Sequence, residues 1–287
     1  MDGQARTGGA DTACDVGTGA GAAVTVLFCN GQLADAGALS AALVNYGHFT
    51  SLQVRAGAVQ GWALHLQRLQ VSTRELFDVE LDGTQLVAWL RQALQQLDAA
   101  DASVRITVFS RQFDFRQPLR TVPVDVLIAV AAPASIPVLA RSVLPLPYQR
   151  ELAHIKHVGT FPLFHLRRQA LQRGFDDALF VDAQGRISEG TTWNLAFWDG
   201  AQVCWPQASA LRGCTERLLM EGLTQLGQAQ THVEVHLPSL SRFSGAAAFN
   251  ASGIWPLAAI GEQHLEQSDV LLAHLQAALA QAPWLAL

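Results

Sequence analysis

A cluster of prolines near the middle of the chain constrains the fold more than any other feature. Four of them fall within fifteen residues, at Pro133, Pro137, Pro145 and Pro147. Proline lacks a backbone N–H and fixes φ, so such a cluster opposes both a helix and a central strand. We therefore predict a proline-rich linker at 133–150, between a smaller N-terminal domain at 24–132 and a larger C-terminal domain at 151–287.

Hydrophobic periodicity predicts both helices and strands in the N-terminal domain. Apolar residues recur at helical spacing over 62–77 and again over 86–97. Short segments rich in β-branched residues, bounded by turn residues, predict strands at 24–30, 49–54, 104–109 and 124–130.

The C-terminal domain repeats this mixture in an irregular order. Its patterns predict helices at 163–173, 215–226 and 269–280, the first ended by Gly174. Strands are expected at 178–182, 186–189, 194–198 and 246–249. Several of these strands are neighbours joined by short turns, which favours two α+β domains over a doubly wound parallel fold.

Composition excludes several classes of protein. The net charge of −5 gives no reason to expect a nucleic acid as partner. No apolar run approaches the roughly 20 residues that span a bilayer, and the N-terminus does not resemble a secretory signal. Residues 1–23 have almost no large apolar groups, so we expect a disordered leader. The four cysteines form no C-x-x-C pair, which is typical of reduced thiols in a cytoplasmic protein.

Lysine is almost absent from this chain. Of the nineteen basic residues, only Lys156 is a lysine. A bias toward arginine codons explains the missing lysines, and one lysine could remain by chance. The alternative is a chemical role, because arginine cannot form a Schiff base: its guanidinium stays protonated and is a poor nucleophile. The count alone leaves both explanations open.

A pyridoxal phosphate site would need more than a lysine. It requires a partner for the ring nitrogen, donors for the phosphate and an anchor for the substrate carboxylate. Lys156 lies in the largely apolar segment 154–158, where desolvation would lower its pKa. Glu189 precedes a Gly-Thr-Thr loop, where a carboxylate could keep a pyridine nitrogen protonated. Taken alone, Glu189 is more often a solvated loop residue.

Three segments could supply phosphate donors, and each has an ordinary alternative. Gly213-Cys214-Thr215 opens a helix, where backbone N–H groups suit an anion, although a plain threonine N-cap is as common. Arg68 shares a helical face with His65 but could be a surface arginine. The segment 250–253 could donate or be only a turn. The histidines show no metal-ligand spacing, so we expect no metal.

In order and spacing these segments resemble the class IV aminotransferases, the fold-type IV enzymes that use pyridoxal phosphate. The resemblance covers about 46–257. It is carried by Tyr46-Gly47, His65-Leu66-Gln67-Arg68-Leu69, Lys156, Gly174-Phe175-Asp176-Asp177-Ala178-Leu179, Glu189-Gly190-Thr191-Thr192-Trp193-Asn194 and Gly213-Cys214-Thr215.

The resemblance implies a two-domain α+β fold of fold type IV and a homodimer with the cofactor between the domains. It implies Lys156 as the Schiff-base lysine and Glu189 as the partner of the ring nitrogen. The other cofactor contacts that it implies are Arg68, Thr192, Asn194, Cys214, Thr215, Asn250 and Ala251. The substrate would be bound by Tyr46, Arg111 and Arg116.

The sequence departs from the family pattern at three positions. Thr50 follows Phe49, as in the aminodeoxychorismate lyases. Phe161 stands where branched-chain transaminases carry a tyrosine, which argues against that subgroup. Glu216 replaces the arginine that usually follows the phosphate-binding threonine. Because a carboxylate would repel a phosphate, we expect Glu216 to point away from the site, toward solvent, Arg212 or Arg217.

The expected activity is transamination of a small amino acid or amine, with a keto acid as acceptor. Pyruvate elimination from aminodeoxychorismate on the same cofactor is the alternative. A non-catalytic binding protein on this fold is a third possibility.

Overall fold

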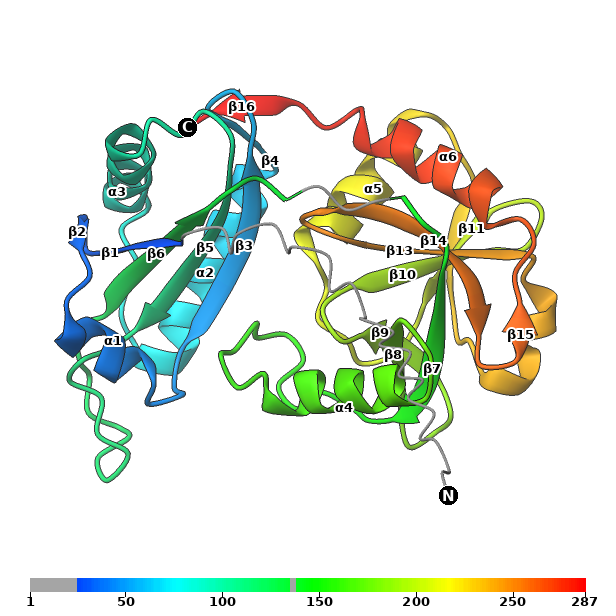
Figure 1. The fold of residues 1–287 in the computed structure, drawn as a ribbon, viewed down its shortest axis with the longest axis horizontal. Coiled ribbons are helices and arrows are strands. Elements are labelled where there is room, and N and C mark those ends of the chain that lie inside the picture. The colour runs from blue at the N-terminus through cyan, green and yellow to red at the C-terminus, as the bar shows by residue number, and fades with distance from the viewer. Residues whose placement is uncertain (1–24, 135–137) are drawn as a thin grey trace, which may run out of the picture.

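The computed structural model describes residues 25–134 and 138–287 (Figure 1). The expected leader at 1–23 lies outside these residues. The described chain contains one large sheet in each half, with helices packed on it, and a small two-stranded sheet, and the expected α+β class is confirmed. None of its helices is long and apolar enough to cross a membrane.

The N-terminal half is built on a five-stranded antiparallel sheet with the order β2-β1-β6-β5-β3. Helices α2 and α3 pack against this sheet, and Leu69, Leu86 and Leu90 are buried between them and the strands. The elements are β1 (Val26–Cys29), β2 (Gln32–Leu33), α1 (Ala36–Ala42), β3 (His48–Val54), β4 (Ala58–Gln60), α2 (Trp62–Phe77), α3 (Gly83–Gln96), β5 (Ala102–Phe109) and β6 (Asp125–Ala131).

The C-terminal half is built on a nine-stranded mixed sheet with the order β12-β11-β10-β13-β14-β7-β8-β9, in which β15 also pairs with β14. Helices α5 and α6 pack against each other and on β13, whereas α4 packs on β7 and β8 (Figure 1). The elements are β7 (Arg141–Pro147), α4 (Phe161–Gln172), β8 (Asp177–Val181), β9 (Ile187–Gly190), β10 (Asn194–Trp198), β11 (Val203–Pro206), α5 (Cys214–Gln225), β12 (Gln230–Val233), η1 (Leu237–Arg242), β13 (Gly245–Asn250), β14 (Gly253–Ile260), β15 (Gln263–His264) and α6 (Ser268–Leu279).

The proline-rich segment is not a linker throughout, which corrects the prediction from the sequence. Part of it forms β7, which pairs in parallel with both β14 and β8. The carbonyl of Val143 accepts a hydrogen bond from the N–H of Gly261, on the β14 side of the strand. Because alternate residues of a strand have the same orientation, the backbone of Pro145 and Pro147 also faces the β14 side. The pairing with β14 ends at Val143, so no residue of β14 requires a backbone N–H from Pro145 or Pro147. The strand therefore tolerates two prolines in the interior of the sheet.

The end of the chain returns to the N-terminal half. Strand β16 (Trp284–Ala286) pairs antiparallel with β4, and Arg91 Nε donates to the carbonyl of Leu287 at 2.6 Å. Figure 1 shows β16 beyond α6, beside β4. This pairing joins the two halves. Residues 284–286 therefore pair with the N-terminal half, although the prediction placed them in the C-terminal domain at 151–287.

Candidate active site

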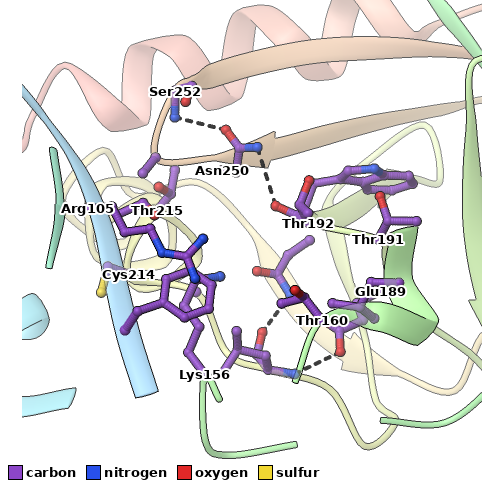
Figure 2. Close-up of a pocket in the computed structure, with 18 of the residues that line it drawn as sticks. Arg105, Lys156, Thr160, Glu189, Thr191, Thr192, Cys214, Thr215, Asn250 and Ser252 are labelled. Carbon is purple, nitrogen blue, oxygen red and sulfur yellow. Dashed lines mark hydrogen bonds between the residues drawn. The ribbon is translucent and has the colours of Figure 1, made fainter. Parts of the chain in front are cut away.

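A cavity of about 240 Å³ lies where the two halves meet (Figure 2). One side, which we call the N-terminal wall, consists of Phe49, Ser51, His65, Arg68 and Arg105. The opposite side, the C-terminal wall, consists of Glu189, Thr191, Thr192, Trp193, Asn194, Leu211, Gly213, Cys214, Thr215, Asn250, Ala251 and Ser252. Between the walls the connection from β7 to α4 contributes Arg150, Lys156 and Thr160.

Lys156 lies on this connection and faces the cavity (Figure 2). Its carbonyl accepts a hydrogen bond from the N–H of Phe49 at 2.9 Å, which fixes the connection to β3. Burial and the positive charges of Arg68 and Arg150 lower the pKa of Lys156 to about 7, although Glu189 opposes the shift. A large part of this amine is therefore neutral near pH 7, and a neutral amine can attack a carbonyl carbon.

Glu189 lies in β9 and is only 3% exposed, so it is not a solvated loop residue. Its Oε1 accepts hydrogen bonds from Arg150 Nε at 2.8 Å and from the N–H of Leu211 at 3.2 Å. Its Oε2 has no hydrogen-bond partner in the described part of the chain. The carboxylate can therefore accept a bond from a cationic group bound in the cavity.

The start of α5 contributes to the C-terminal wall. The helix begins at Cys214, one residue earlier than predicted, with Gly213 as its N-cap. Thr215 is therefore not the N-cap. A Cβ at position 213 would lie 2.6 Å from Asn194 Oδ1, so only glycine lets the chain pass this close. The first N–H groups of a helix lack intrahelical partners, so a helix start at a cavity suits an anion such as phosphate.

The turn between β13 and β14 lies next to the start of α5 and is held by Asn250. Asn250 Oδ1 accepts a bond from the N–H of Ser252 at 2.8 Å, and Asn250 Nδ2 donates to the carbonyl of Thr192 at 3.3 Å (Figure 2). Ala251 lies between them and lines the cavity. These bonds join the loop after β9 to the turn after β13.

The loop after β9 is fixed from behind by a buried aspartate. Asp177 Oδ1 accepts a bond from Thr191 Oγ1 at 2.8 Å, and Asp177 Oδ2 accepts one from Trp193 Nε1 at 3.0 Å. Asn194 Nδ2 donates to the carbonyl of Leu211 at 2.8 Å. The C-terminal wall is thus held in place by bonds within the protein.

Arg68 on α2 is largely buried rather than a surface arginine, and burial lowers its pKa. Its Nη2 donates to the Thr50 hydroxyl, which also bonds His65 Nδ1 at 2.7 Å. The pKa of His65 is lowered to about 3 by burial and by Arg68, so this ring is neutral. Arg68 Nε is buried and has no partner among the described residues. A buried cation with an unused donor and no carboxylate fits an anion in the cavity.

Together these residues fit pyridoxal phosphate, the cofactor implied by the resemblance. The orphaned Nε of Arg68 and the start of α5 could hold its phosphate. The free oxygen of Glu189 could bind its ring nitrogen, and the partly neutral Lys156 could reach its aldehyde carbon.

The three residues predicted to bind the substrate lie outside the cavity. Tyr46 donates its hydroxyl to the carbonyl of Leu76 at 3.0 Å. Arg111 pairs with Asp125 at 3.2 Å, and 73% of the Arg116 side chain is exposed. The loop that follows β5 therefore does not bring either arginine into the cavity of this chain.

The arginine that faces the cavity from this region is Arg105 on β5 (Figure 2). Its guanidinium carbon lies 3.6 Å from the centroid of the Phe49 ring, and burial lowers its pKa. Arg105 makes no hydrogen bond or ion pair to any residue that the structure describes. Arg105 was not predicted from the sequence as a site residue, although it is the only charged residue within the strand 102–109.

Glu216 points away from the cavity, as predicted. It pairs with Arg212, with Nη1 to Oε1 at 2.8 Å. The side chain is only 2% exposed, so it is directed into the protein rather than toward solvent. Arg212 also donates to the carbonyls of Pro206 and Ala208, at 3.1 and 3.0 Å. The pair therefore fixes the loop that precedes α5.

Three solved structures illustrate the fold that this chain shares with known proteins. The branched-chain amino acid aminotransferase of Escherichia coli has a TM-score of 0.77 at 18% identity, over 89% of this chain and 93% of that chain. A candidate 4-amino-4-deoxychorismate lyase from Legionella pneumophila has a TM-score of 0.74 at 19% identity, over 84% of this chain and 92% of that chain. A hypothetical aminotransferase from Mycobacterium tuberculosis, in its PLP-bound form, has a TM-score of 0.72 at 19% identity, over 89% of this chain and 99% of that chain.

These likenesses confirm the predicted fold type. No curated protein matches the chain by sequence. Residues 47–260 match the family described as Amino-transferase class IV, over most of the region in which we noted the resemblance. The match includes Lys156, Glu189 and the start of α5. The chain therefore belongs to the class IV aminotransferase family.

Proposed function

We propose that this chain is a pyridoxal-phosphate-dependent aminotransferase in which Lys156 Nζ bonds the cofactor covalently. One observation carries the proposal. The only lysine of the chain lies at the cavity between the two halves, with its pKa lowered to about 7. Membership of the class IV family supports both the reaction type and the cofactor.

Each wall has a separate task in this reaction. When bound, pyridoxal phosphate supplies an electron sink for the substrate carbon that bears the nitrogen. Glu189 Oε2 would hold the ring nitrogen of the bound cofactor, and its negative charge would favour the protonated form of that nitrogen. Arg68 and the start of α5 bind the phosphate. Lys156 Nζ, once free, moves the proton at the substrate carbon.

The substrate is an amino acid rather than a simple amine. Arg105 supports this because it is a largely buried cation with no partner among the described residues, and it would bind a carboxylate well. Amino donors and keto-acid acceptors both carry such a group, so one anchor serves both. Arg105 takes the role that the sequence analysis assigned to Arg111 and Arg116.

We also propose that the protein is a cytoplasmic homodimer. Exposed apolar side chains of Leu152, Phe161 and Phe164 lie on and beside α4 near the cavity, which supports a covered surface there. Cys29, Cys204 and Cys214 are buried free thiols, as in reducing compartments. Light scattering of the cofactor-loaded protein would give twice the chain mass.

Aminodeoxychorismate lyase is a second candidate, and Thr50 favours it. The Phe49-Thr50 pair resembles those lyases, and the Thr50 hydroxyl is bonded to Arg68 and His65. Two assays distinguish the reactions. Amino transfer is measured with alanine and a keto acid, and pyruvate release is measured with aminodeoxychorismate. Pyruvate release without amino transfer would select the lyase.

The proposal is tested by trapping the covalent link. Borohydride reduction of cofactor-loaded protein should place the label on Lys156, as found by peptide mapping. Lys156→Ala should bind the cofactor without a label and lose all turnover. A label on another residue, or the lack of a visible absorbance band in the cofactor-loaded wild type, would contradict the assignment and favour a binding protein.

A further inference from the structure

Arg150 and Glu189 form an ion pair in which both side chains are nearly inaccessible, at 4% and 3%. No other ion pair within the described residues has both partners this deeply buried. We infer that Arg150 is a positioning residue, which keeps Glu189 charged and turns its Oε2 toward the ring nitrogen of the cofactor. This inference rests on the proposed function.

The charge of Glu189 needs a nearby cation. A carboxylate with no partner in a dry site takes up a proton, because burial disfavours the charged form. A neutral carboxylic acid would not hold a ring nitrogen protonated. Arg150 is the only cationic side chain that donates a hydrogen bond to Glu189 in the described chain. Lys156 does not substitute, because in the proposed function its Nζ bonds the cofactor.

The geometry selects one of the two carboxylate oxygens. Both protein donors, Arg150 Nε at 2.8 Å and the Leu211 N–H at 3.2 Å, bind Oε1. Leu211 is itself fixed, because its carbonyl accepts the bond from Asn194 Nδ2 at 2.8 Å. With Oε1 held from two directions, the carboxylate cannot rotate freely, and Oε2 is the oxygen left for a ligand.

Arg150 also connects the two catalytic segments. It precedes Lys156 on the connection from β7 to α4, whereas Glu189 lies in β9. The ion pair therefore fixes the lysine segment relative to the wall that binds the ring. Arg150 Nη1 and Nη2 make no hydrogen bond to any described residue, so a second role, binding the substrate carboxylate directly, must be distinguished by experiment.

The experiment uses cofactor-loaded protein and pyridoxal phosphate labelled with ¹⁵N in the ring. The ¹⁵N chemical shift reports the protonation of the ring nitrogen without any turnover. Arg150→Gln removes the charge but keeps an N–H donor, and Arg150→Lys keeps the charge. Arg186→Gln is the matched control, because Arg186 also pairs with a buried carboxylate, Asp182 at 2.8 Å, but lies away from the cavity.

We expect a protonated ring nitrogen in the wild type, Arg150→Lys and Arg186→Gln, and loss of that proton in Arg150→Gln. In Arg150→Gln, kcat should fall at least ~10-fold with little change in KM, at the lower end of what acid–base and electrostatic groups contribute. Combined with Glu189→Gln, the Arg150 change should cost almost nothing more, because both act through one group.

The outcomes separate the inference from the proposed function. A wild type that forms no link at Lys156 would overturn the proposed function. A wild type with the link, together with a ring nitrogen still protonated in Arg150→Gln, would overturn the inference alone. A raised KM at unchanged kcat would make Arg150 a substrate anchor instead. If Arg150→Gln fails to fold, the inference is judged on Arg150→Lys, and a deprotonated ring there would overturn it.

Discussion

The two walls of the cavity differ in how their polar groups are satisfied. In the C-terminal wall, Glu189, Thr191, Asn194 and Asn250 all make side-chain hydrogen bonds within the protein. In the N-terminal wall, Arg105 has no polar partner among the described residues, and Arg68 bonds only uncharged groups. Most polar groups of the C-terminal wall are bonded within the protein, with Glu189 Oε2 left free for a ligand, whereas the N-terminal wall presents cations without counter-charges.

This difference indicates which parts of the site depend on a ligand. Bonds within the C-terminal wall fix the ring-binding groups before any ligand arrives, so little ordering remains for binding to accomplish. The cations of the N-terminal wall are costly to bury alone and become favourable when an anion neutralises them. The phosphate and the substrate carboxylate therefore complete the N-terminal wall.

The largest effect is expected from removing the negative charge of Glu189 from the C-terminal wall. Glu189→Gln keeps an oxygen for the Leu211 N–H but removes the negative charge, so kcat should fall at least ~10²-fold while the cofactor stays bound. Steady-state rates and cofactor absorbance measure both. Asp177→Asn changes a buried carboxylate behind the same wall and should lower stability rather than kcat. An unchanged kcat in Glu189→Gln would make Glu189 merely structural.

Removing Arg68 from the N-terminal wall should weaken binding of the cofactor phosphate more than removing any single side chain of the C-terminal wall. Arg68→Ala should weaken cofactor binding by about 2–3 kcal/mol, because a charge-assisted bond to a buried anion is lost. Thr215→Ala should cost about 1 kcal/mol, since backbone donors remain. Titration of the cofactor into apoprotein gives both values, and the more exposed Arg217→Ala is the control. Equal losses for Arg68 and Thr215 would contradict the comparison.

The sequence revealed the two walls unequally. The C-terminal wall is made of continuous segments, such as 189–194 and 213–215, whose local order carries the pattern. The N-terminal wall combines Phe49 and Ser51 of β3 and two residues of α2 with Arg105 of β5, and β3 and β5 are in contact because Ser51 pairs with Arg105. The register between two strands is set by their tertiary pairing. The sequence therefore predicts that Arg105 lies in a strand, but not which face of the sheet its side chain is on.

The range of one amphipathic helix was predicted from the sequence in full. The helical period gave the range 62–77, which matches α2, because only one face of that helix is buried. Burial on both faces does not by itself hide a strand, because β8 and β10 are buried throughout and were predicted, whereas the similarly buried β11 and β14 were missed. Arg150 was missed because it lies at the end of the segment interpreted as a linker.

A smaller effect, confined to one class of substrate, is expected from Arg105. Arg105→Met should lower kcat/KM for amino acids about 10- to 100-fold, which corresponds to the loss of one charge-assisted bond. Primary amines without a carboxylate should react at the wild-type rate. Arg111→Met is the control, because Arg111 lies outside the cavity, paired with Asp125. A larger loss in Arg111→Met would return the anchor to the loop after β5.

The smallest effect concerns Glu216, which lies buried in the C-terminal half and has an unsatisfied atom among the described residues. Glu216 Oε2 has no partner, and burial raises the pKa of this carboxyl despite the attraction of Arg212. A raised native pKa means that the folded state holds the proton more tightly than the unfolded state does. Stability from this group is therefore present below the ordinary glutamate value of 4.5 and is lost as pH rises through the native pKa.

Glu216→Gln fixes a neutral group that can still accept the bond from Arg212. We expect the free energy of unfolding to rise by up to about 1 kcal/mol at pH 7.5, the size of one hydrogen-bond adjustment, and the gain to disappear near pH 4. Urea unfolding of cofactor-loaded protein at both pH values measures this. Glu221→Gln makes the same change at an exposed position of α5 and should alter stability by less than about 0.5 kcal/mol. A less stable Glu216→Gln at pH 7.5 would show that the attraction of Arg212 outweighs the cost of burial, so that even behind the C-terminal wall every charge is satisfied.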